Sequence, residues 1–141
     1  MKKTNFRISA IVLCITVIFS TSVVFASTTT LMSYSGRGIR DKDSVETFSL
    51  SKNTTIHLEH KTTGVQYNGA QPDSKCSLQI ALLKKGTFSY AATGDEVYMT
   101  GLGAKNTAWT KSSGTYRLHF ATKALSETWW PGADIEGRIY K

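Results

Sequence analysis

Cysteine and proline are scarce in this chain of 141 residues, which contains two of each. Cys14 lies in an apolar N-terminal run, so a domain that follows this run has only Cys76. A single thiol cannot close an internal disulfide, and such a domain depends on its hydrophobic core for stability. Charged residues are also few, at 19%, while 40% of the residues are hydrophobic. This balance excludes a disordered polar chain, and the length fits one small domain.

The first 26 residues have the pattern of a secretory signal peptide. A basic start precedes a nearly continuous apolar run, Ile8–Phe19, and small residues before position 27 predict cleavage after Ala26. The polar residues behind the run disfavour an uncleaved membrane anchor, and the leucine before Cys14 disfavours a lipid anchor. We therefore expect a secreted, extracellular mature domain of residues 27–141. The basic start and the scarcity of cysteine are typical of a bacterial product.

The excess of positive charge is mild once the signal peptide is removed. Lys and Arg then fall from 17 to 14, against 10 acidic residues, and they are scattered along the chain. Nucleic-acid binding normally requires a dense basic stripe, so we expect no nucleic-acid partner. Weak attraction to cell-wall polysaccharide or to a membrane surface is the most that this charge supports, and we expect a monomer.

Apolar and polar residues alternate along most of residues 27–141, which is the period of half-buried β-strands. Turn signals separate about seven or eight such segments, among them Thr63-Gly64 and Thr93-Gly94-Asp95. We predict an all-β antiparallel sandwich or barrel, with a loop at residues 35–38 and a single helical turn near Lys123–Glu127. The residues expected to face the core are Phe48, Leu50, Ile56, Leu58, Cys76, Leu78, Ile80, Leu82, Val97, Met99, Tyr116, Leu118, Phe120, Ile135 and Ile139.

Four segments follow one another in an order that is found in a known family. They are Phe48–Leu50, Thr55–Leu58, Leu78–Leu83 with the Lys-Lys-Gly that follows, and Gly114–Phe120. Over residues 45–140 this succession resembles that of bacterial pre-peptidase C-terminal domains. The resemblance implies a small, secreted, jelly-roll-like β-sandwich. No protease accompanies the domain in this chain, so the resemblance gives a fold and leaves the function open.

Two groups of residues invite a metal interpretation. His57 and Glu59 share one face of a predicted strand, and His119 from another outward face could add a third ligand, whereas His60 points the other way. Asp41 and Asp43 could supply oxygen ligands for calcium from a loop. An ordinary solvent-facing strand and turn capping are the simpler explanations, and we expect neither a metal nor a cofactor.

Catalytic signatures are weak in this sequence. Cys76 is in phase with core residues, where a cysteine is inert, and no serine lies in a Gly-x-Ser-x-Gly elbow. Asp134 and Glu136 share a strand face as a glycosidase pair would, but the sequence indicates no cleft around them. We therefore predict a noncatalytic protein.

Aromatic residues are the most suggestive group. Trp129 and Trp130 must point to opposite sides of an extended backbone, so one can be buried while the other stays partly exposed. With Trp109 or Tyr98 nearby, an exposed tryptophan could stack on a sugar ring or enter a membrane interface, although the pair could also cap the end of the sandwich. These residues predict a secreted binding or structural protein that contacts cell-wall glycan or another extracellular polymer. The alternative is a secreted effector that acts on membranes or competing cells.

Overall fold

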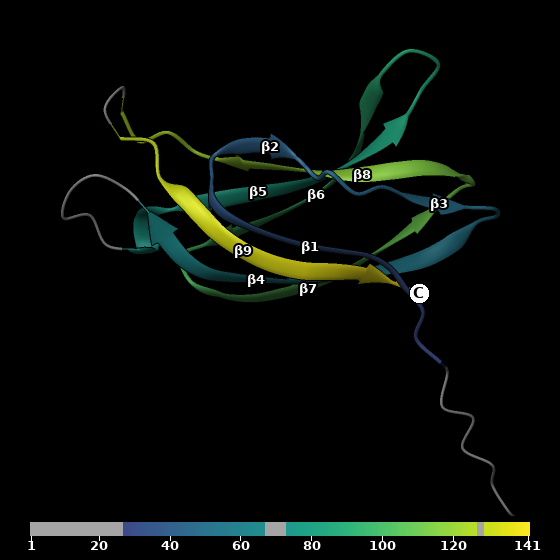
Figure 1. Cartoon of the computed structure of the whole chain (residues 1–141), viewed down its shortest axis with the longest axis horizontal. Helices are drawn as coiled ribbons and strands as arrows, with labels where there is room; N and C mark the ends of the chain where they lie inside the picture. The colour runs from purple at the N-terminus through teal and green to yellow at the C-terminus, as the bar shows by residue number, and fades with distance from the viewer. Residues whose placement is uncertain (1–26, 67–72, 127–128) are drawn as a thin grey trace, which may run out of the picture.

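The computed structural model describes residues 27–66, 73–126 and 129–141, which form nine strands and one short 3-10 turn (Figure 1). The predicted signal peptide, residues 1–26, lies outside the described residues. Within the described ranges no helix is long and apolar enough to cross a membrane. The elements are β1 (Thr30–Ile39), β2 (Asp41–Asp43), β3 (Phe48–Leu50), β4 (Thr54–Gln66), the 3-10 turn η1 (Asp73–Lys75), β5 (Ser77–Lys85), β6 (Tyr90–Thr100), β7 (Gly103–Lys111), β8 (Gly114–Thr122) and β9 (Gly132–Tyr140).

The strands form two antiparallel sheets packed face to face (Figure 1). The first sheet has the order β1-β9-β4-β7, and the second has the order β2-β8-β5-β6, with β3 also paired to β8. Each early strand thus pairs with a late one: β1 with β9, β2 and β3 with β8, and β4 with β7. The chain is a long hairpin rolled up across both sheets, which is the connectivity of a jelly roll. The predicted all-β, antiparallel, jelly-roll-like β-sandwich is confirmed.

The core lies between the sheets and contains the alternating residues that the sequence pattern selected, except that Met99 is only partly buried. It also contains Met32, Trp109 and Ala133, which the pattern did not select. On β5, Leu78, Ile80 and Leu82 are buried, and on β4 the inward row continues from Ile56 and Leu58 to His60 and Thr62. Burying one large aliphatic side chain contributes about 1.5–3 kcal/mol, so these rows decide which face of each strand turns inward. Cys76 is buried at the end of its row, as its phase predicts.

Several predicted turns and the predicted helical turn are different in the structure. Thr63-Gly64 and Thr93-Gly94-Asp95 are irregular positions inside the long strands β4 and β6, and residues 35–38 belong to β1. Glycine in a bulge adopts a positive φ without ending the strand, as Gly38 (φ 59°) and Gly94 (φ 81°) do. The described part of the expected helix, residues 123–126, contains no helical turn, and Ser126 instead forms a β-bridge with Trp129.

Candidate functional site

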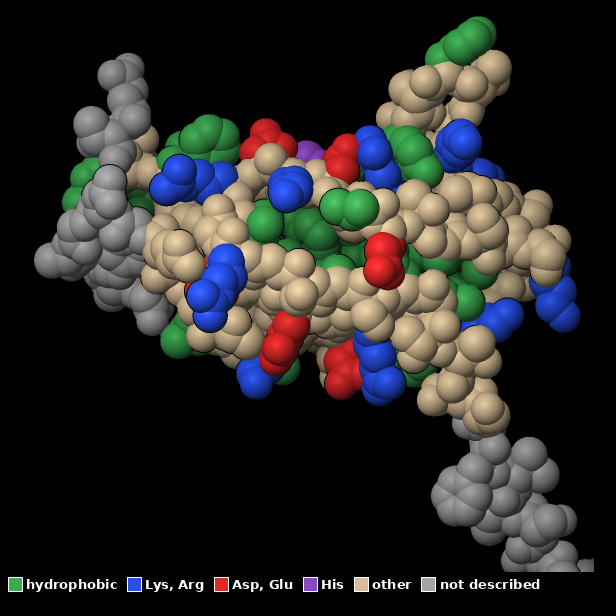
Figure 2. All heavy atoms as spheres, viewed as in Figure 1, with side chains coloured by type: hydrophobic (Ala, Val, Ile, Leu, Met, Phe, Trp, Pro, Cys, Tyr) green, Lys and Arg blue, Asp and Glu red, His purple; other side chains and the backbone are tan. Residues whose placement is uncertain are grey.

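A cleft of about 540 Å³ opens at the side of the sandwich where β1 faces β2 and the segment that follows β2. Figure 2 views this side, and hydrophobic side chains are visible inside the hollow between the edges of the two sheets. The volume is within the range of ligand-binding pockets. We call this site the edge cleft. Its more buried lining residues include Tyr34, Ile39, Phe120 and Ile135, and its outer residues include Arg37, Lys42, Asp43, Ser44, Val45 and Glu46.

The outer wall of the edge cleft exists because the edge strand of the second sheet is broken between β2 and β3. At the break, the Ser44 amide donates to the carbonyl oxygen of Leu118 at 2.7 Å, and the Leu118 amide donates to Ser44 Oγ at 3.1 Å. The Ser44 hydroxyl in turn donates to the carbonyl oxygen of Glu46 at 2.8 Å. The Ser44 side chain thus takes the place of a backbone acceptor in the pairing with β8, and the backbone that follows Ser44 can leave the sheet. Val45, which lines the cleft, is 90% exposed as a result.

Two aromatic rings from different sheets meet on the floor of the cleft. The ring centroids of Tyr34 on β1 and Phe120 on β8 are 5.0 Å apart, with an angle of 49° between the ring planes. Ile39 and Ile135 lie on the same floor. The floor is therefore apolar and aromatic, whereas Arg37, Lys42 and Glu46 give the rim both signs of charge.

A buried chain of hydrogen bonds fixes Tyr34 on the side that faces away from the cleft. Its hydroxyl is 2.8 Å from His60 Nδ1, His60 Nε2 is 3.1 Å from Thr62 Oγ1, and the Thr62 hydroxyl donates to Met99 Sδ at 3.2 Å. Since Thr62 has one proton and gives it to sulfur, His60 Nε2 must donate to Thr62. His60 Nδ1 is then unprotonated and accepts the hydrogen bond of Tyr34.

Gly137 makes this chain possible, because Tyr34 and His60 lie on strands that are separated by β9. Gly137 pairs with Tyr34 on one side and with His60 on the other. A Cβ atom at this position would lie 2.4 Å from the Tyr34 hydroxyl oxygen and 2.3 Å from the carbonyl oxygen of Glu59. Only glycine leaves the space through which the tyrosine reaches the histidine.

Burial keeps both partners of this hydrogen bond uncharged. His60 is only 1% exposed, and desolvation lowers its pKa to about 4. Desolvation also raises the pKa of Tyr34 well above its usual range. At neutral pH the floor of the edge cleft is therefore supported by a neutral, satisfied network, which favours a fixed ring position.

Trp109 lies far from the other tryptophans selected from the sequence. Trp109 is buried on β7 opposite Ile56, near the start of β4. The two adjacent tryptophans precede β9, whose first residue Gly132 pairs with Gln66 at the far end of β4. At roughly 3.3 Å per residue the two positions along β4 are about 30 Å apart, so these tryptophans cannot form one platform.

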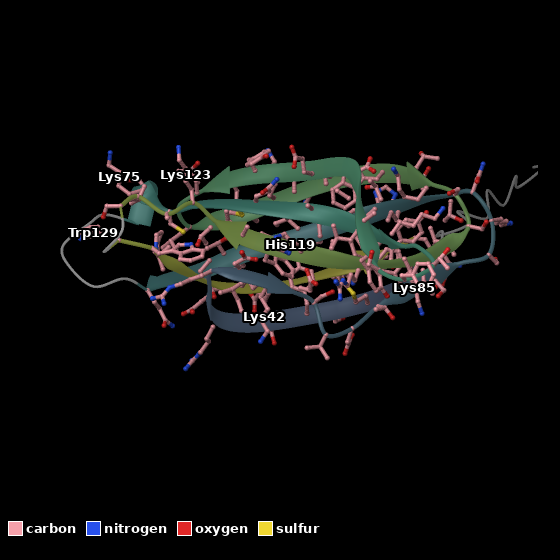
Figure 3. All side chains as sticks on the ribbon, turned by 90° about the horizontal axis from the view of Figure 1, so that it is seen from above. Lys42, Lys75, Lys85, His119, Lys123 and Trp129 are labelled. Atoms are coloured by element: carbon pink, nitrogen blue, oxygen red, sulfur yellow. The ribbon has the colours of Figure 1, made fainter. Side chains whose placement is uncertain are left out.

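The remaining aromatic candidates are partly exposed, and each is hydrogen-bonded within the protein. Trp130 is 42% exposed, and its Nε1 donates to the carbonyl oxygen of Thr122 at 3.0 Å. Figure 3 shows Trp129 at one end of the sandwich, together with Lys75 and Lys123. Tyr98 is 54% exposed on β6 and donates to Glu96 Oε1 at 3.0 Å, a hydrogen bond that raises the pKa of the tyrosine.

The residues considered for a histidine metal site lie on opposite sheets. His57 on β4 stacks on Tyr140, with ring centroids 5.2 Å apart, and Glu59 accepts a hydrogen bond from Arg138 at 2.7 Å. His119 is on β8 of the second sheet (Figure 3), so it cannot complete a site with them. The suggested third ligand is wrong because the strand that carries it faces the other side of the sandwich.

The predicted aspartate loop is in fact the short strand β2, paired with β8. Asp43 forms an ion pair with Arg117 and lies 2.8 Å from His119 Nδ1, while Asp41 is 3.5 Å from His119 Nε2. These contacts occupy the carboxylate of Asp43. In the part of the chain that the structure describes, no three His, Cys, Asp or Glu side chains are placed to hold a metal ion.

Sequence reasoning missed Tyr34, Ser44 and His60 as parts of a site. Tyr34 lies next to residues interpreted as a loop, and nothing in the sequence shows that a distant glycine makes room for it. His60 carries a usable signal, because it is in phase with Ile56 and Leu58 and therefore belongs to the inward row.

Comparisons with protein-family models, with curated proteins and with solved structures return no match for this chain. The resemblance to pre-peptidase C-terminal domains stays a prediction.

Proposed function

We propose that this protein is a noncatalytic binding module that holds a sugar ring of an extracellular glycan in the edge cleft. A sugar ring presents C–H groups on its faces and hydroxyl groups around its edge. It therefore matches a site with an aromatic floor and a polar rim. The observation that carries the proposal is the pairing of the Tyr34 and Phe120 rings on the floor of a cleft of about 540 Å³.

The support behind the floor adds to this proposal. A side chain that is already fixed loses little conformational entropy when a ligand packs against it. Tyr34 is fixed by its hydrogen bond to His60 and by its contact with Phe120. The rim, in contrast, consists of exposed Arg37, Lys42 and Glu46, whose side chains can adapt to the hydroxyl groups of different sugars.

The test uses residues 27–141, which contain all nine strands and the core between them. Affinity is measured against a panel of soluble cell-wall glycans by calorimetry. Tyr34→Leu removes the aromatic floor, and we expect about tenfold weaker binding. Tyr34→Phe keeps the ring while it removes the hydrogen bond to His60, so it is the matched control and should lose much less affinity than Tyr34→Leu.

A second pair of variants separates the edge cleft from the tryptophan end. Glu46→Ala at the rim should weaken binding severalfold, whereas Trp130→Ala should leave it unchanged. The edge-cleft proposal fails if Trp130→Ala abolishes binding and Tyr34→Leu does not. A glycan held by stacking and neutral hydrogen bonds should also bind almost equally well at low and high salt.

Secretion is part of the same proposal. The basic start and apolar run of residues 1–26 support export, and a module that binds an extracellular polymer must reach the outside of the cell. The expected mature N-terminus is Ser27, which N-terminal sequencing of protein from the culture medium checks. Material that stays with the cells and begins at Met1 would contradict this part.

A further inference from the structure

The β5–β6 hairpin carries the most exposed large hydrophobic side chain of the described residues. Phe88 is 99% exposed at the tip, and Ala91 and Ala92 beside it are exposed as well. Figure 1 shows the hairpin rising away from the sandwich, and Figure 2 shows hydrophobic atoms at its tip above Lys and Arg side chains at its base. One exposed apolar side chain is common on protein surfaces, so Phe88 indicates a contact surface only together with the projection and the basic residues at its base.

The hairpin projects because β6 bulges. Ala81 pairs with Glu96 and Leu83 with Ala92, so three residues of β6 oppose a single residue of β5 between these pairs. Gly94 within the bulge has a φ of 81°, and the Thr93 hydroxyl donates to the carbonyl oxygen of Leu82 at 3.0 Å. Such a bulge bends the strand and changes the direction in which the hairpin points.

The tip itself is an ordered turn. The Gly86 amide donates to the carbonyl oxygen of Ser89 at 2.7 Å, which closes a loop of four residues with Phe88 in it. The last pair between β5 and β8 joins Lys84 and Tyr116, so the tip extends beyond the sheet by a few residues, on the order of 10 Å. This reach matches the depth to which interfacial side chains enter a bilayer.

The base of the hairpin is basic. It contains a hollow of about 410 Å³ whose lining includes Lys84, Lys85, Lys111 and Ser112. Lys111 is paired with Asp95, whereas Lys84 and Lys85 form no ion pair with any described carboxylate. The Lys84 ammonium donates to Ser112 Oγ at 2.8 Å, which fixes it at the wall of the hollow.

The projecting part of the hairpin is free of negative charge. None of residues 74–94 is acidic, and the acidic residues of β6, Asp95 and Glu96, follow the bulge, where Asp95 is paired with Lys111. Arg117 on β8 lies over the ring of Tyr90, with 4.0 Å between its guanidinium carbon and the ring centroid, and its charge is balanced by the ion pair with Asp43. An aromatic tip above basic side chains arranges apolar and positively charged groups in the order in which a bilayer presents acyl chains and anionic head groups.

We propose that the β5–β6 hairpin docks this protein on an anionic phospholipid bilayer. Phe88 enters the boundary between head groups and acyl chains, and Lys84 and Lys85, which point to opposite faces of β5, meet lipid phosphates on the two sides of the hairpin. This surface lies outside the edge cleft and is independent of the glycan proposal. Both contacts can form at once, because no residue lines both sites.

The test measures sedimentation of residues 27–141 with vesicles, since the apolar run at 8–19 would enter a bilayer by itself. The vesicles contain either phosphatidylcholine or an equal mixture of phosphatidylcholine and phosphatidylglycerol. We expect binding to the anionic vesicles only, and weaker binding as salt is raised. Equal binding to both vesicles, or binding to neither, overturns the proposal.

Variants then separate the tip from the base. Phe88→Ala should weaken vesicle binding about tenfold, and Lys85→Gln should weaken it about fivefold. The matched controls are Leu102→Ala, an exposed apolar residue in the β6–β7 turn, and Lys105→Gln on β7. Both controls should bind as the unchanged chain does. A loss in the controls as large as in the hairpin variants contradicts docking through the hairpin.

The depth to which position 88 enters the bilayer can be measured independently of the affinity for vesicles. In Phe88→Trp the new indole should be quenched by lipids with brominated acyl chains, whereas Leu102→Trp should show no added quenching. Because Phe88 makes no buried contact, these variants should keep the melting temperature of the unchanged chain. Binding without quenching at position 88 would show that the tip stays outside the bilayer and would refute the proposed insertion.

Discussion

His60 is the residue whose chemistry depends most on its place in the fold. Buried between Tyr34 and Thr62, it must be neutral for its hydrogen bonds to hold. Its pKa falls from 6.5 in the unfolded chain to about 4 in the folded protein, because burial penalises the charged ring. Between these two values the unfolded state binds the proton more readily, so acid favours unfolding.

We therefore expect His60 to make a constant contribution to the free energy of unfolding above pH 6.5. As the pH drops from 6.5 to 4, this contribution should make the free energy of unfolding fall. The loss should approach about 3 kcal/mol. Urea unfolding across this range measures it. His57→Gln on the outer face should keep the same pH dependence, while His60→Gln should remove this contribution. A His60→Gln curve that still falls as steeply would show that other groups cause the effect.

Gly137 gives a second prediction at the same scale. Gly137→Ala places a methyl group against the Tyr34 hydroxyl and the Glu59 carbonyl oxygen, and the backbone contact cannot move easily. We expect a loss of about 3 kcal/mol in stability, measured by thermal or urea unfolding. The neighbouring Glu136→Ala, which removes only an exposed ion pair with Lys61, should change stability by less than about 1 kcal/mol. Equal effects of the two variants would be inconsistent with the crowding at Gly137.

At the scale of elements, the break between β2 and β3 decides whether the edge cleft exists. Ser44→Ala deprives the Leu118 amide of its side-chain acceptor at the point where the edge strand leaves the sheet. An unsatisfied amide costs about 1–3 kcal/mol, and its hydrogen should exchange faster with solvent. Hydrogen exchange at Leu118 provides the measurement. Ser49→Ala, which loses only an exposed bond to Thr115, serves as the control and should leave that exchange rate unchanged.

The alternation of apolar and polar side chains along the chain predicted the strands and their inward faces. Successive side chains of a pleated strand point to opposite faces, so burial of one face requires this alternation at each residue. The alternation could not predict where the strands end. Thr63-Gly64 and Thr93-Gly94-Asp95 have the composition of turns, yet both are irregular positions inside β4 and β6. Pairing with a long partner strand continues on both sides of the irregularity, and this partner is distant in the sequence. The same limit applies to the edge cleft, whose walls come from strands that meet only in the folded chain.

For the whole molecule, the sequence predicted the jelly-roll-like sandwich but not its two candidate surfaces. Composition pointed to the tryptophans, and one of them, Trp109, is buried in the core. The edge cleft depends on Tyr34, Phe120 and the detour after Ser44, and the hairpin depends on the bulge near Gly94. The fold thus places the two proposed binding surfaces, the edge cleft for a polymer and the hairpin for a lipid bilayer, on one small domain.

The pairing of β1 with β9 brings the two ends of this domain together. Thr29 and Lys141 exchange two backbone hydrogen bonds, at 2.8 and 3.0 Å. A pulling force applied at these two ends is directed along the hydrogen bonds between β1 and β9. These bonds therefore break one after another, beginning at the ends. We expect a lower unfolding force in this geometry than with handles at Ser27 and at the start of β9, which load all the bonds of the pair at once. Single-molecule pulling compares the two, and equal forces would mean that another part of the sandwich yields first. A domain held between two attachments, one at each terminus, would thus open first at this pair of strands, whatever its thermal stability.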